Sequence, residues 1–165
     1  MSNPRTAAVI IASTRAATGV YPDRTGPVIV DWLQDKGFAV TDPIVVADGD
    51  AVGDALRDAV AGSAVVITSG GTGISPTDTT PEQTAGVLDR EIPGLADAIR
   101  RSGVEAGVAT ATLSRGLCGV AGSALVVNLP GSTGGVRDGL AVLDGVLEHA
   151  LSQLAGGDHR SGGGV

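Results

Sequence analysis

The feature that most constrains the fold is an apolar run that ends in glycines and is followed by a helix start. Residues 65–67 (Val-Val-Ile) are β-branched without polar alternation, which is typical of a strand buried on both faces. The next six residues, Thr-Ser-Gly-Gly-Thr-Gly (68–73), cannot continue that strand. Thr80 as N-cap, Pro81 and Gln83 then predict a helix. This order presents backbone N–H groups to an anion, so phosphate is the predicted ligand class.

A carboxylate, Asp78, lies between the glycines and the helix start. Beside a bound phosphate it would repel the ligand unless a cation lies between them, so we predict a Mg²⁺ position there. Asp48, which follows an earlier strand, could share the ion, because Mg²⁺ takes oxygen ligands and bridges carboxylates to substrate phosphates. For each aspartate taken alone, a solvated loop carboxylate is the competing interpretation.

Length and composition favour a single α/β domain over residues 1–155, followed by a disordered tail at 156–165. Hydrophobic residues make up 42% of the chain but aromatic residues only 2%, so Val, Leu, Ile and Ala must build the core. Such a core suits a parallel sheet covered by helices better than a sandwich rich in aromatic pairs.

Charge and cysteine content exclude several classes of function. The net charge of -7, with Lys36 as the only lysine, disfavours binding to nucleic acid or to an anionic membrane, because both require basic surfaces. One cysteine, Cys118, excludes an internal disulfide and a cysteine-based zinc site. With neither a signal peptide nor a long apolar run, we expect a cytoplasmic protein.

Strands and helices alternate along the chain, which predicts a mostly parallel sheet with helices on both faces. We expect strands at 6–12, 38–46, 65–67 and 124–129, with a break at Asp42-Pro43 in the second. We expect helices at 27–36, 50–62, 81–88 and 95–101 and one long helix that carries an apolar stripe from 136 to 154. The segment 110–116 is small and polar enough to be a loop that faces a ligand.

In such a sheet the loops after the strands gather at one edge, where ligands bind. That places four segments around one cleft: residues 13–15, Asp48, residues 69–78 and residues 128–132. The last of these opens a second glycine loop after a buried strand. Plain tight turns are the competing interpretation of each glycine loop.

Familiar signatures of other chemistries are missing. The first glycine loop lacks the Gly-Lys-Ser/Thr ending of a Walker loop, and Pro76 falls where a dinucleotide fingerprint needs its third glycine. No Ser-His-Asp or Cys-His set can be assembled, and Cys118 is more typical of a small core residue than of a nucleophile. Three arginines in loops, Arg15, Arg24 and Arg115, are candidates for phosphate contacts.

Five ordered motifs resemble the molybdopterin-binding family, and above all its MogA/MoaB-like molybdopterin adenylyltransferase branch, to which the G domain of gephyrin is similar. They lie at residues 68–73, 78–82, 92–95, 113–116 and 128–132, and the loop 19–27 matches as well. The resemblance covers nearly the whole chain up to Leu154.

The resemblance implies a three-layer αβα domain, usually a homotrimer, that transfers AMP from Mg²⁺-ATP to the terminal phosphate of molybdopterin and releases pyrophosphate. A downstream molybdate-inserting enzyme is a further implied partner. Asp48 and Asp78 match the two important aspartates of the family, as metal-binding or catalytic groups. The resemblance implies substrate or nucleotide contacts at Ser13, Arg15, Thr68, Ser69, Gly70, Gly71, Thr72, Gly73, Ser114, Arg115, Asn128, Pro130, Gly131 and Ser132.

Three positions depart from the family pattern. Residues 13–15 read Ser-Thr-Arg where many relatives carry an aspartate before the arginine, Thr77 stands in place of a common arginine, and Thr133 in place of a common proline. They leave open a paralogue that binds molybdopterin as a carrier without catalysis, although retention of both Asp48 and Asp78 favours the enzyme. The related domain of the molybdate-inserting enzyme is a third possibility. In that enzyme extra domains accompany it, and their absence here counts against this possibility.

Overall fold

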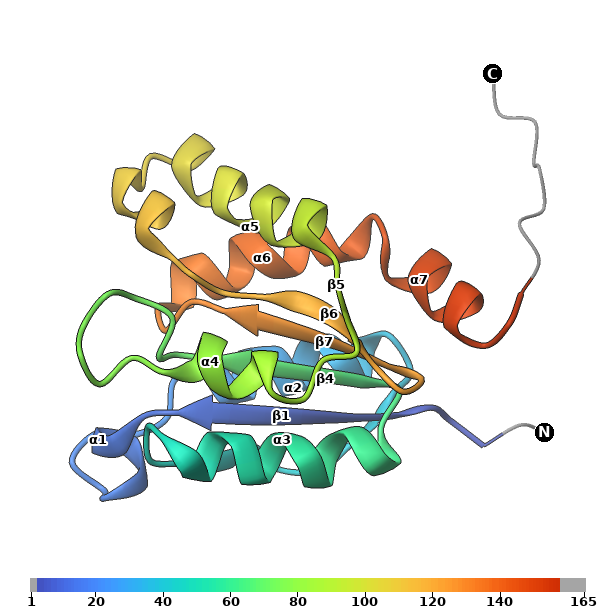
Figure 1. Ribbon diagram of the computed structural model, residues 1–165, viewed down its shortest axis with the longest axis horizontal. Helices are drawn as coiled ribbons and strands as arrows, with labels where there is room; N and C mark the ends of the chain where they lie inside the picture. The colour runs from blue at the N-terminus through green and yellow to red at the C-terminus, as the bar shows by residue number, and fades with distance from the viewer. Residues whose placement is uncertain (1–2, 158–165) are drawn as a thin grey trace.

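A computed structural model describes residues 3–157, and its centre is a seven-stranded sheet in the order β2-β1-β4-β7-β6-β5, with β3 also paired to β1 (Figure 1). The pairs among β1, β2, β3, β4 and β7 are parallel, whereas β6 runs antiparallel to β7 and β5 to β6. The strands are β1 (Thr6–Ala12), β2 (Ala39–Val40), β3 (Ile44–Val46), β4 (Val65–Ser69), β5 (Arg90–Glu91), β6 (Cys118–Ala121) and β7 (Ala124–Leu129).

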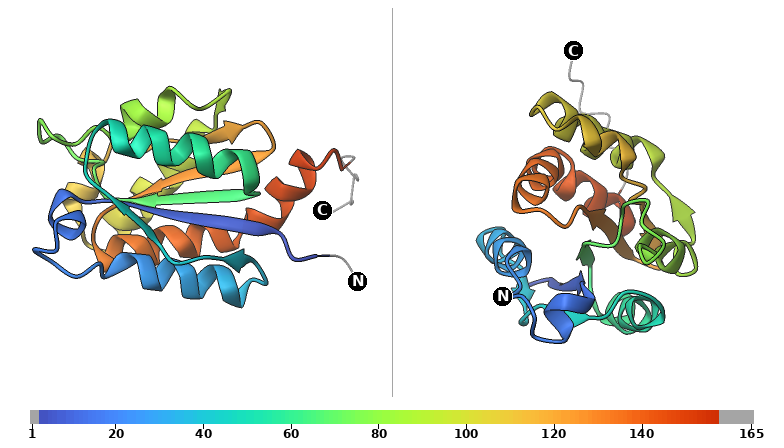
Figure 2. Two further views of the ribbon diagram at one scale, coloured as in Figure 1. Left: turned by 90° about the horizontal axis from the view of Figure 1, so that it is seen from below. Right: turned by 90° about the vertical axis from the view of Figure 1, so that its left-hand side faces the viewer.

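Helices cover both faces of the sheet, so the predicted α/β class with a mostly parallel sheet is confirmed (Figure 2). Helices α2, α5, α6 and α7 contribute to one hydrophobic cluster, and α3 contributes to a smaller cluster on the other face. The helices are α1 (Thr14–Ala17), α2 (Thr25–Asp35), α3 (Asp50–Gly62), α4 (Thr80–Ala85), α5 (Pro93–Glu105), α6 (Thr133–Asp144) and α7 (Leu147–Leu154), with a 3₁₀ helix η1 (Ala109–Leu113).

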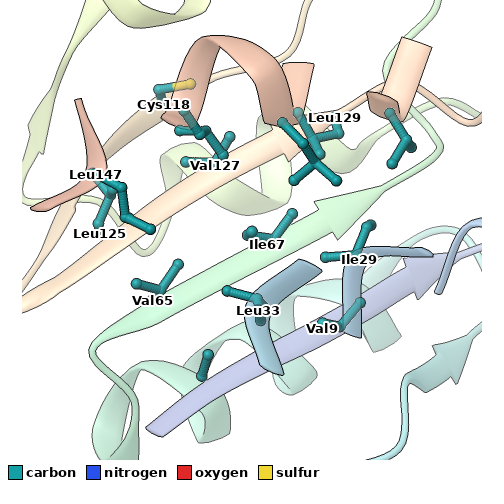
Figure 3. Packing of buried hydrophobic residues seen from close by; sticks show 14 of the residues in the cluster. Val9, Ile29, Leu33, Val65, Ile67, Cys118, Leu125, Val127, Leu129 and Leu147 are labelled. Atoms are coloured by element: carbon teal, nitrogen blue, oxygen red, sulfur yellow. The ribbon is translucent and has the colours of Figure 1, made fainter. Parts of the chain in front are cut away.

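The central strands lack polar alternation because both of their faces are buried. In β4, Val65 and Ile67 pack into the larger cluster, where they lie near Leu33 of α2 (Figure 3), while Val66 packs into the smaller one. In β1, Val9 and Ile10 divide between the two clusters in the same way. Each strand therefore contributes apolar area to both layers.

Several boundaries differ from the expectation. The single long helix expected from 136 to 154 is wrong: α6 ends at Asp144 with Gly145 as C-cap, and α7 begins at Leu147. The apolar stripe runs through the interruption, because Leu143, Leu147 and Leu151 are all buried in the same cluster. A stripe therefore indicated the buried side correctly but not the continuity of the helix.

Shorter segments also needed correction. Helix α4 starts at Thr80 with Thr79 as its N-cap and ends at Ala85, rather than running from 81 to 88. The segment expected to be a loop at 110–116 is largely η1, and the antiparallel strands β5 and β6 were not predicted. The interrupted second strand is confirmed, because residues 41–43 separate β2 from β3.

Two expectations concern the ends and the environment of the chain. Of the predicted disordered tail, residues 158–165 lie outside the described part, so this stays a prediction. Within the described residues, no helix has the length and apolar character needed to cross a membrane.

Candidate functional site

A polar cavity lies beyond the carboxyl ends of β1 and β4, the edge where the sequence places the ligand. Helix α1 and the loop after β4 lie at this same end of the sheet, on the left in Figure 1. The cavity measures about 500 Å³. Eight residues predicted for the site line it: Ser13, Arg15, Asp48, Ser69, Gly70, Gly71, Asp78 and Gly131. Four chain segments that are distant in sequence therefore meet at one hollow.

Glycines form part of its lining, and at Gly70 a larger residue would have to displace the backbone. Gly70 has a φ of +96°, and a Cβ there would lie 2.4 Å from the carbonyl oxygen of Ala12. Gly71 has a φ of +66°, and its Cβ would lie 2.3 Å from the Thr80 hydroxyl. At Gly131, in the second glycine loop, a Cβ would lie 3.4 Å from the Cα of Gly70, so the two loops touch.

Backbone donors remain available in this lining. Among the hydrogen bonds of residues 3–157, none is donated by the N–H of Gly71 or of Gly131, although both residues line the cavity. The N–H of Gly70 instead bonds the carbonyl of Leu129 at 3.1 Å and joins the two loops. Unpaired N–H groups beside a cavity suit an anionic ligand.

Asp48 is oriented by helix α1. Its Oδ2 accepts hydrogen bonds from the Thr14 hydroxyl at 3.1 Å and from the Thr14 N–H at 3.3 Å. The Thr14 hydroxyl in turn accepts the N–H of Asp48 at 3.2 Å. Ser13 is the N-cap of α1 and accepts the N–H of Ala16 at 3.2 Å, so this hydroxyl organises the loop that carries Thr14.

Asp78 is held within its own loop. Its Oδ2 accepts the N–H of Ser75 at 3.2 Å, and a Cβ on Gly73 would lie 2.8 Å from the same oxygen. In the described part of the chain, Oδ1 of Asp78 and Oδ1 of Asp48 accept no hydrogen bond. Each carboxylate at the cavity thus keeps one oxygen free.

These two carboxylates fit a Mg²⁺ ion only together with a phosphate ligand. Among residues 3–157, no group of three or more His, Cys, Asp or Glu side chains could hold a metal. Mg²⁺ is commonly bound by one or two carboxylates, with water and substrate phosphates completing the octahedron. Asp48 and Asp78 at the wall of one cavity meet that requirement.

Arg115, predicted as a phosphate contact, is used inside the protein. Its Nε donates to the carbonyl of Gly73 at 2.8 Å and its Nη2 to the carbonyl of Asp78 at 2.8 Å, while Nη1 pairs with Glu82. Its backbone N–H bonds the carbonyl of Thr72 at 2.7 Å. The bonded guanidinium holds the pKa of the Glu82 carboxyl below its ordinary value of 4.5. Arg115 therefore fastens both ends of the loop that carries Asp78.

Two further predicted residues, Thr68 and Asn128, lie beneath the cavity and do not line it. The Asn128 amide donates to the hydroxyls of Thr68 at 2.9 Å and Thr84 at 3.0 Å, and its oxygen accepts the N–H of Leu117 at 3.0 Å. All three polar side chains are buried. Direct contact with a ligand would require these bonds to break, so their evident role is to hold β4, β7 and α4 together.

A second, largely apolar cavity of about 220 Å³ borders the same two loops. Five predicted residues line it: Thr72, Gly73, Ser114, Pro130 and Ser132. Ser132 is also the N-cap of α6, where it accepts the N–H of Gly135 at 3.1 Å. The remaining wall comes from α5, η1 and α6, with Ile99, Val108 and Leu113 among its side chains.

Some lining residues were missed by sequence reasoning. Thr14 and Thr25 line the polar cavity, and Arg100 and Asp138 line the apolar one. Thr14 lies in the segment 13–15 that the sequence placed at the cleft, although it was not named as a binding residue. Arg100 and Asp138 lie on helices whose surface positions look alike in sequence, so only the packing of α5 against α6 distinguishes them.

Cys118 lies in the core, as its type suggested. It is buried in β6, and burial raises the pKa of its thiol to about 12. A thiol that is protonated at neutral pH is a poor nucleophile, and Cys118 lines neither cavity, so we assign it no role in the site.

Comparison with known proteins agrees with the motifs and the geometry. The family model described as "Probable molybdopterin binding domain" matches residues 8–149. The chain belongs to the molybdopterin-binding domain family. The resemblance inferred from the motifs is thereby confirmed.

Within this molybdopterin-binding family, the fold is similar to that of the molybdopterin biosynthesis Mog protein from Mycobacterium ulcerans. The two are 62% identical with a TM-score of 0.89, over 94% of this chain and 99% of that one. A molybdopterin adenylyltransferase of Escherichia coli is 33% identical over 149 residues, 85% of this chain and 72% of that protein. A molybdenum cofactor biosynthesis bifunctional protein of Synechococcus elongatus is 39% identical over 155 residues, 93% of this chain. The chain spans about half, 48%, of that bifunctional relative.

Proposed function

We propose that this chain is a molybdopterin adenylyltransferase that acts in molybdenum cofactor biosynthesis with ATP as its second substrate. The observation that carries the proposal is that neighbouring residues of the same two loops line the polar cavity and the apolar cavity. Thr72 and Gly73 line one cavity while Gly70 and Gly71 line the other, and the loop around Gly131 divides in the same way. A ligand with a flat ring system and a terminal phosphate, as molybdopterin has, can occupy both.

The polar cavity suits the phosphates of both substrates. The unpaired N–H groups of Gly71 and Gly131 would donate to phosphate oxygens, and Arg15 at the rim adds positive charge. Arg15 already stacks over the Tyr21 ring, with its guanidinium carbon 5.5 Å from the ring centroid. This contact limits the freedom of the guanidinium and keeps it near the cavity.

The proposed reaction is a direct transfer of the adenylyl group. An oxygen of the terminal phosphate of molybdopterin attacks the α-phosphorus of ATP, and a new P–O bond forms. The bond from that phosphorus to the oxygen bridging to the β-phosphate breaks, and pyrophosphate leaves with the electron pair. Such a transfer depends on positioning and charge stabilisation and needs no covalent nucleophile.

Asp48 and Asp78 would hold the Mg²⁺ ion. When bound, Mg²⁺ supplies positive charge that offsets the charge of the phosphates. The free oxygen on each carboxylate, with the second oxygen held by Thr14 or by the Ser75 N–H, supports this role. Without a cation the same carboxylates would oppose phosphate binding, which argues against a carrier with no catalytic function.

Two parts of the proposal rest on the family alone: assembly into a homotrimer and a downstream molybdate-inserting enzyme as partner. A cytoplasmic location is a further part of the proposal and rests on the sequence. The sedimentation behaviour of the purified chain would test the first of these.

The test is release of pyrophosphate from molybdopterin, ATP and Mg²⁺ by the purified protein. We expect Asp78→Asn to abolish release while molybdopterin binding is largely retained, because the second cavity is unchanged. Asp42→Asn, an exposed loop carboxylate outside both cavities, is the matched control and should leave release unchanged. Molybdopterin binding without any AMP transfer by the wild type would support the carrier paralogue instead.

A further inference from the structure

The apolar cavity contains one carboxylate, Asp138 of α6, for which the fold has no evident use. Asp138 is half-buried and lines the cavity together with Gly135, one turn earlier on the same face of the helix. None of the hydrogen bonds and ion pairs found in residues 3–157 involves its carboxylate. A carboxylate in such a place is an acceptor without a donor.

The other charged group of this cavity is already engaged. Arg100 donates to the carbonyls of Ser114 at 3.1 Å and Gly116 at 2.9 Å and pairs with Asp97 at 2.7 Å. It therefore supports the chain that leads into β6 and is no free partner for Asp138. Among the described residues that line the cavity, Asp138 is thus the charged group left to bind a ligand.

We propose that Asp138 determines specificity for the pterin ring by accepting hydrogen bonds from its N3–H and its 2-amino group, an inference that rests on the function proposed above. These two groups are parallel donors on one edge of the ring, as on one side of a guanidinium. A carboxylate has two acceptor oxygens that match such a pair. The apolar side chains Ile99, Val108 and Leu113 suit the flat faces of the same ring.

This arrangement requires a ligand with two parallel hydrogen-bond donors on one edge of its ring. Lumazine has the same fused ring as pterin but a carbonyl where pterin has the 2-amino group. Bound in the same orientation, that carbonyl would face a carboxylate oxygen, so one hydrogen bond is lost and two acceptors meet. A site built around a donor pair rejects such an analogue strongly. An asparagine, with one acceptor and one donor, would match the N3–H and the carbonyl of lumazine instead.

The experiment measures dissociation constants of pterin and lumazine by fluorescence titration for the wild type, Asp138→Asn and Asp138→Ala. We expect the wild type to bind pterin at least about tenfold more tightly than lumazine. Asp138→Asn should reverse that preference, and Asp138→Ala should weaken pterin binding and remove most of the discrimination. If Asp138 had a purely structural role, the substitutions would weaken the binding of both ligands without reversing which of the two binds more tightly. Asp31→Asn, an exposed carboxylate on α2 outside both cavities, should leave the ratio as in the wild type.

Three results would overturn the inference: an unchanged ratio in Asp138→Asn, equal binding of the two compounds by the wild type, or binding of neither. Pyrophosphate release measured on the same preparations separates the two proposals. If the wild type releases pyrophosphate but the ratio does not respond to Asp138→Asn, only the role of Asp138 fails. If it neither releases pyrophosphate nor binds pterin, the proposed function fails too.

Discussion

Thr14 and Asp48 are joined by reciprocal hydrogen bonds: the hydroxyl of Thr14 donates to Asp48 Oδ2 at 3.1 Å and accepts the N–H of Asp48 at 3.2 Å. The pair connects α1 to the residues after β3 and sets the direction of a carboxylate at the polar cavity. Both bonds depend on the hydroxyl, so its removal tests whether the orientation of Asp48 matters for the proposed transfer.

Thr14→Val keeps the shape of the side chain but removes both of these hydroxyl bonds. We expect the rate of pyrophosphate release to fall about five- to tenfold, the equivalent of about 1 to 1.4 kcal/mol for one misplaced hydrogen-bonded group. The Mg²⁺ concentration needed for half-maximal release should rise, because Asp48 Oδ2 keeps only the bond from the N–H of residue 14. Thr41→Val, at an exposed loop position outside both cavities, is the control. Equal effects of the two substitutions would contradict the orienting role.

The Glu82–Arg115 pair predicts a specific dependence of stability on pH. The pKa of Glu82 is lowered in the folded protein, so its contribution to the free energy of unfolding is fully present above its ordinary value of 4.5 and is lost as pH falls through the lower folded pKa. Glu82→Gln should therefore be less stable than the wild type at pH 7. That difference should shrink below pH 4.5. The pair is largely exposed, so the difference should stay below about 1 kcal/mol. Urea unfolding of both proteins across this pH range is the measurement, and a difference that grows as pH falls would contradict it.

Gly70 and Gly107 permit a matched test of the contact between β1 and the first glycine loop. Both have a φ of +96°, but a Cβ at Gly107 meets nothing within 4 Å, whereas one at Gly70 lies 2.4 Å from the Ala12 carbonyl oxygen. Gly107→Ala should lose only the backbone term, about 1 to 2 kcal/mol. Gly70→Ala must also displace backbone, so we expect it to lose at least about 2 kcal/mol more. Equal midpoints of urea unfolding would show that the loop can move away.

The buried thiol of Cys118 should be unreactive in the folded protein. Its pKa of about 12 keeps it protonated at pH 8, and it is not accessible to reagent. A disulfide reagent such as 5,5′-dithiobis(2-nitrobenzoic acid) should therefore react at a rate set by unfolding, and rapidly once urea is added. Fast reaction of the native protein at pH 8 would mean that β6 opens locally.

The sequence predicts the central strands of this protein better than its short outer strands and the ends of its helices. The strands at 6–12 and 124–129 were located to the residue, because runs of β-branched residues bounded by glycine or polar turns allow few alternatives. The strand expected at 65–67 begins where predicted but continues through Thr68 and Ser69, whose side chains are buried. Strands β5 and β6 were not predicted, since β5 has only two residues and β6 is a four-residue segment that contains Cys118 and Gly119 in place of a β-branched run. The break at Gly145 between α6 and α7 was hidden by an apolar stripe that is buried on both sides of it.

For the candidate site, the sequence predicts the location but not the hydrogen bonds of the individual side chains. That the loops meet at one edge follows from the parallel order of strands, so Asp48 and Asp78 could be placed together from the sequence. Which side chains remain free could not, because it depends on individual hydrogen bonds. Arg115 and Asn128 look like ligand contacts in sequence, yet both are occupied by the protein itself. Asp138, which looks like an ordinary helix surface residue, is the charged group of the apolar cavity that has no partner among the described residues.

The hydrogen bond from the Gly70 N–H to the Leu129 carbonyl joins the two glycine loops, and adjacent residues of these loops line the polar cavity and the apolar cavity. A ligand that displaces these loops in one cavity alters the shape met by a ligand in the other. The affinities of the two substrates should therefore be linked, and by equal factors in both directions. Evolution of a new ring preference on the apolar side would for the same reason carry a cost for nucleotide handling on the polar side.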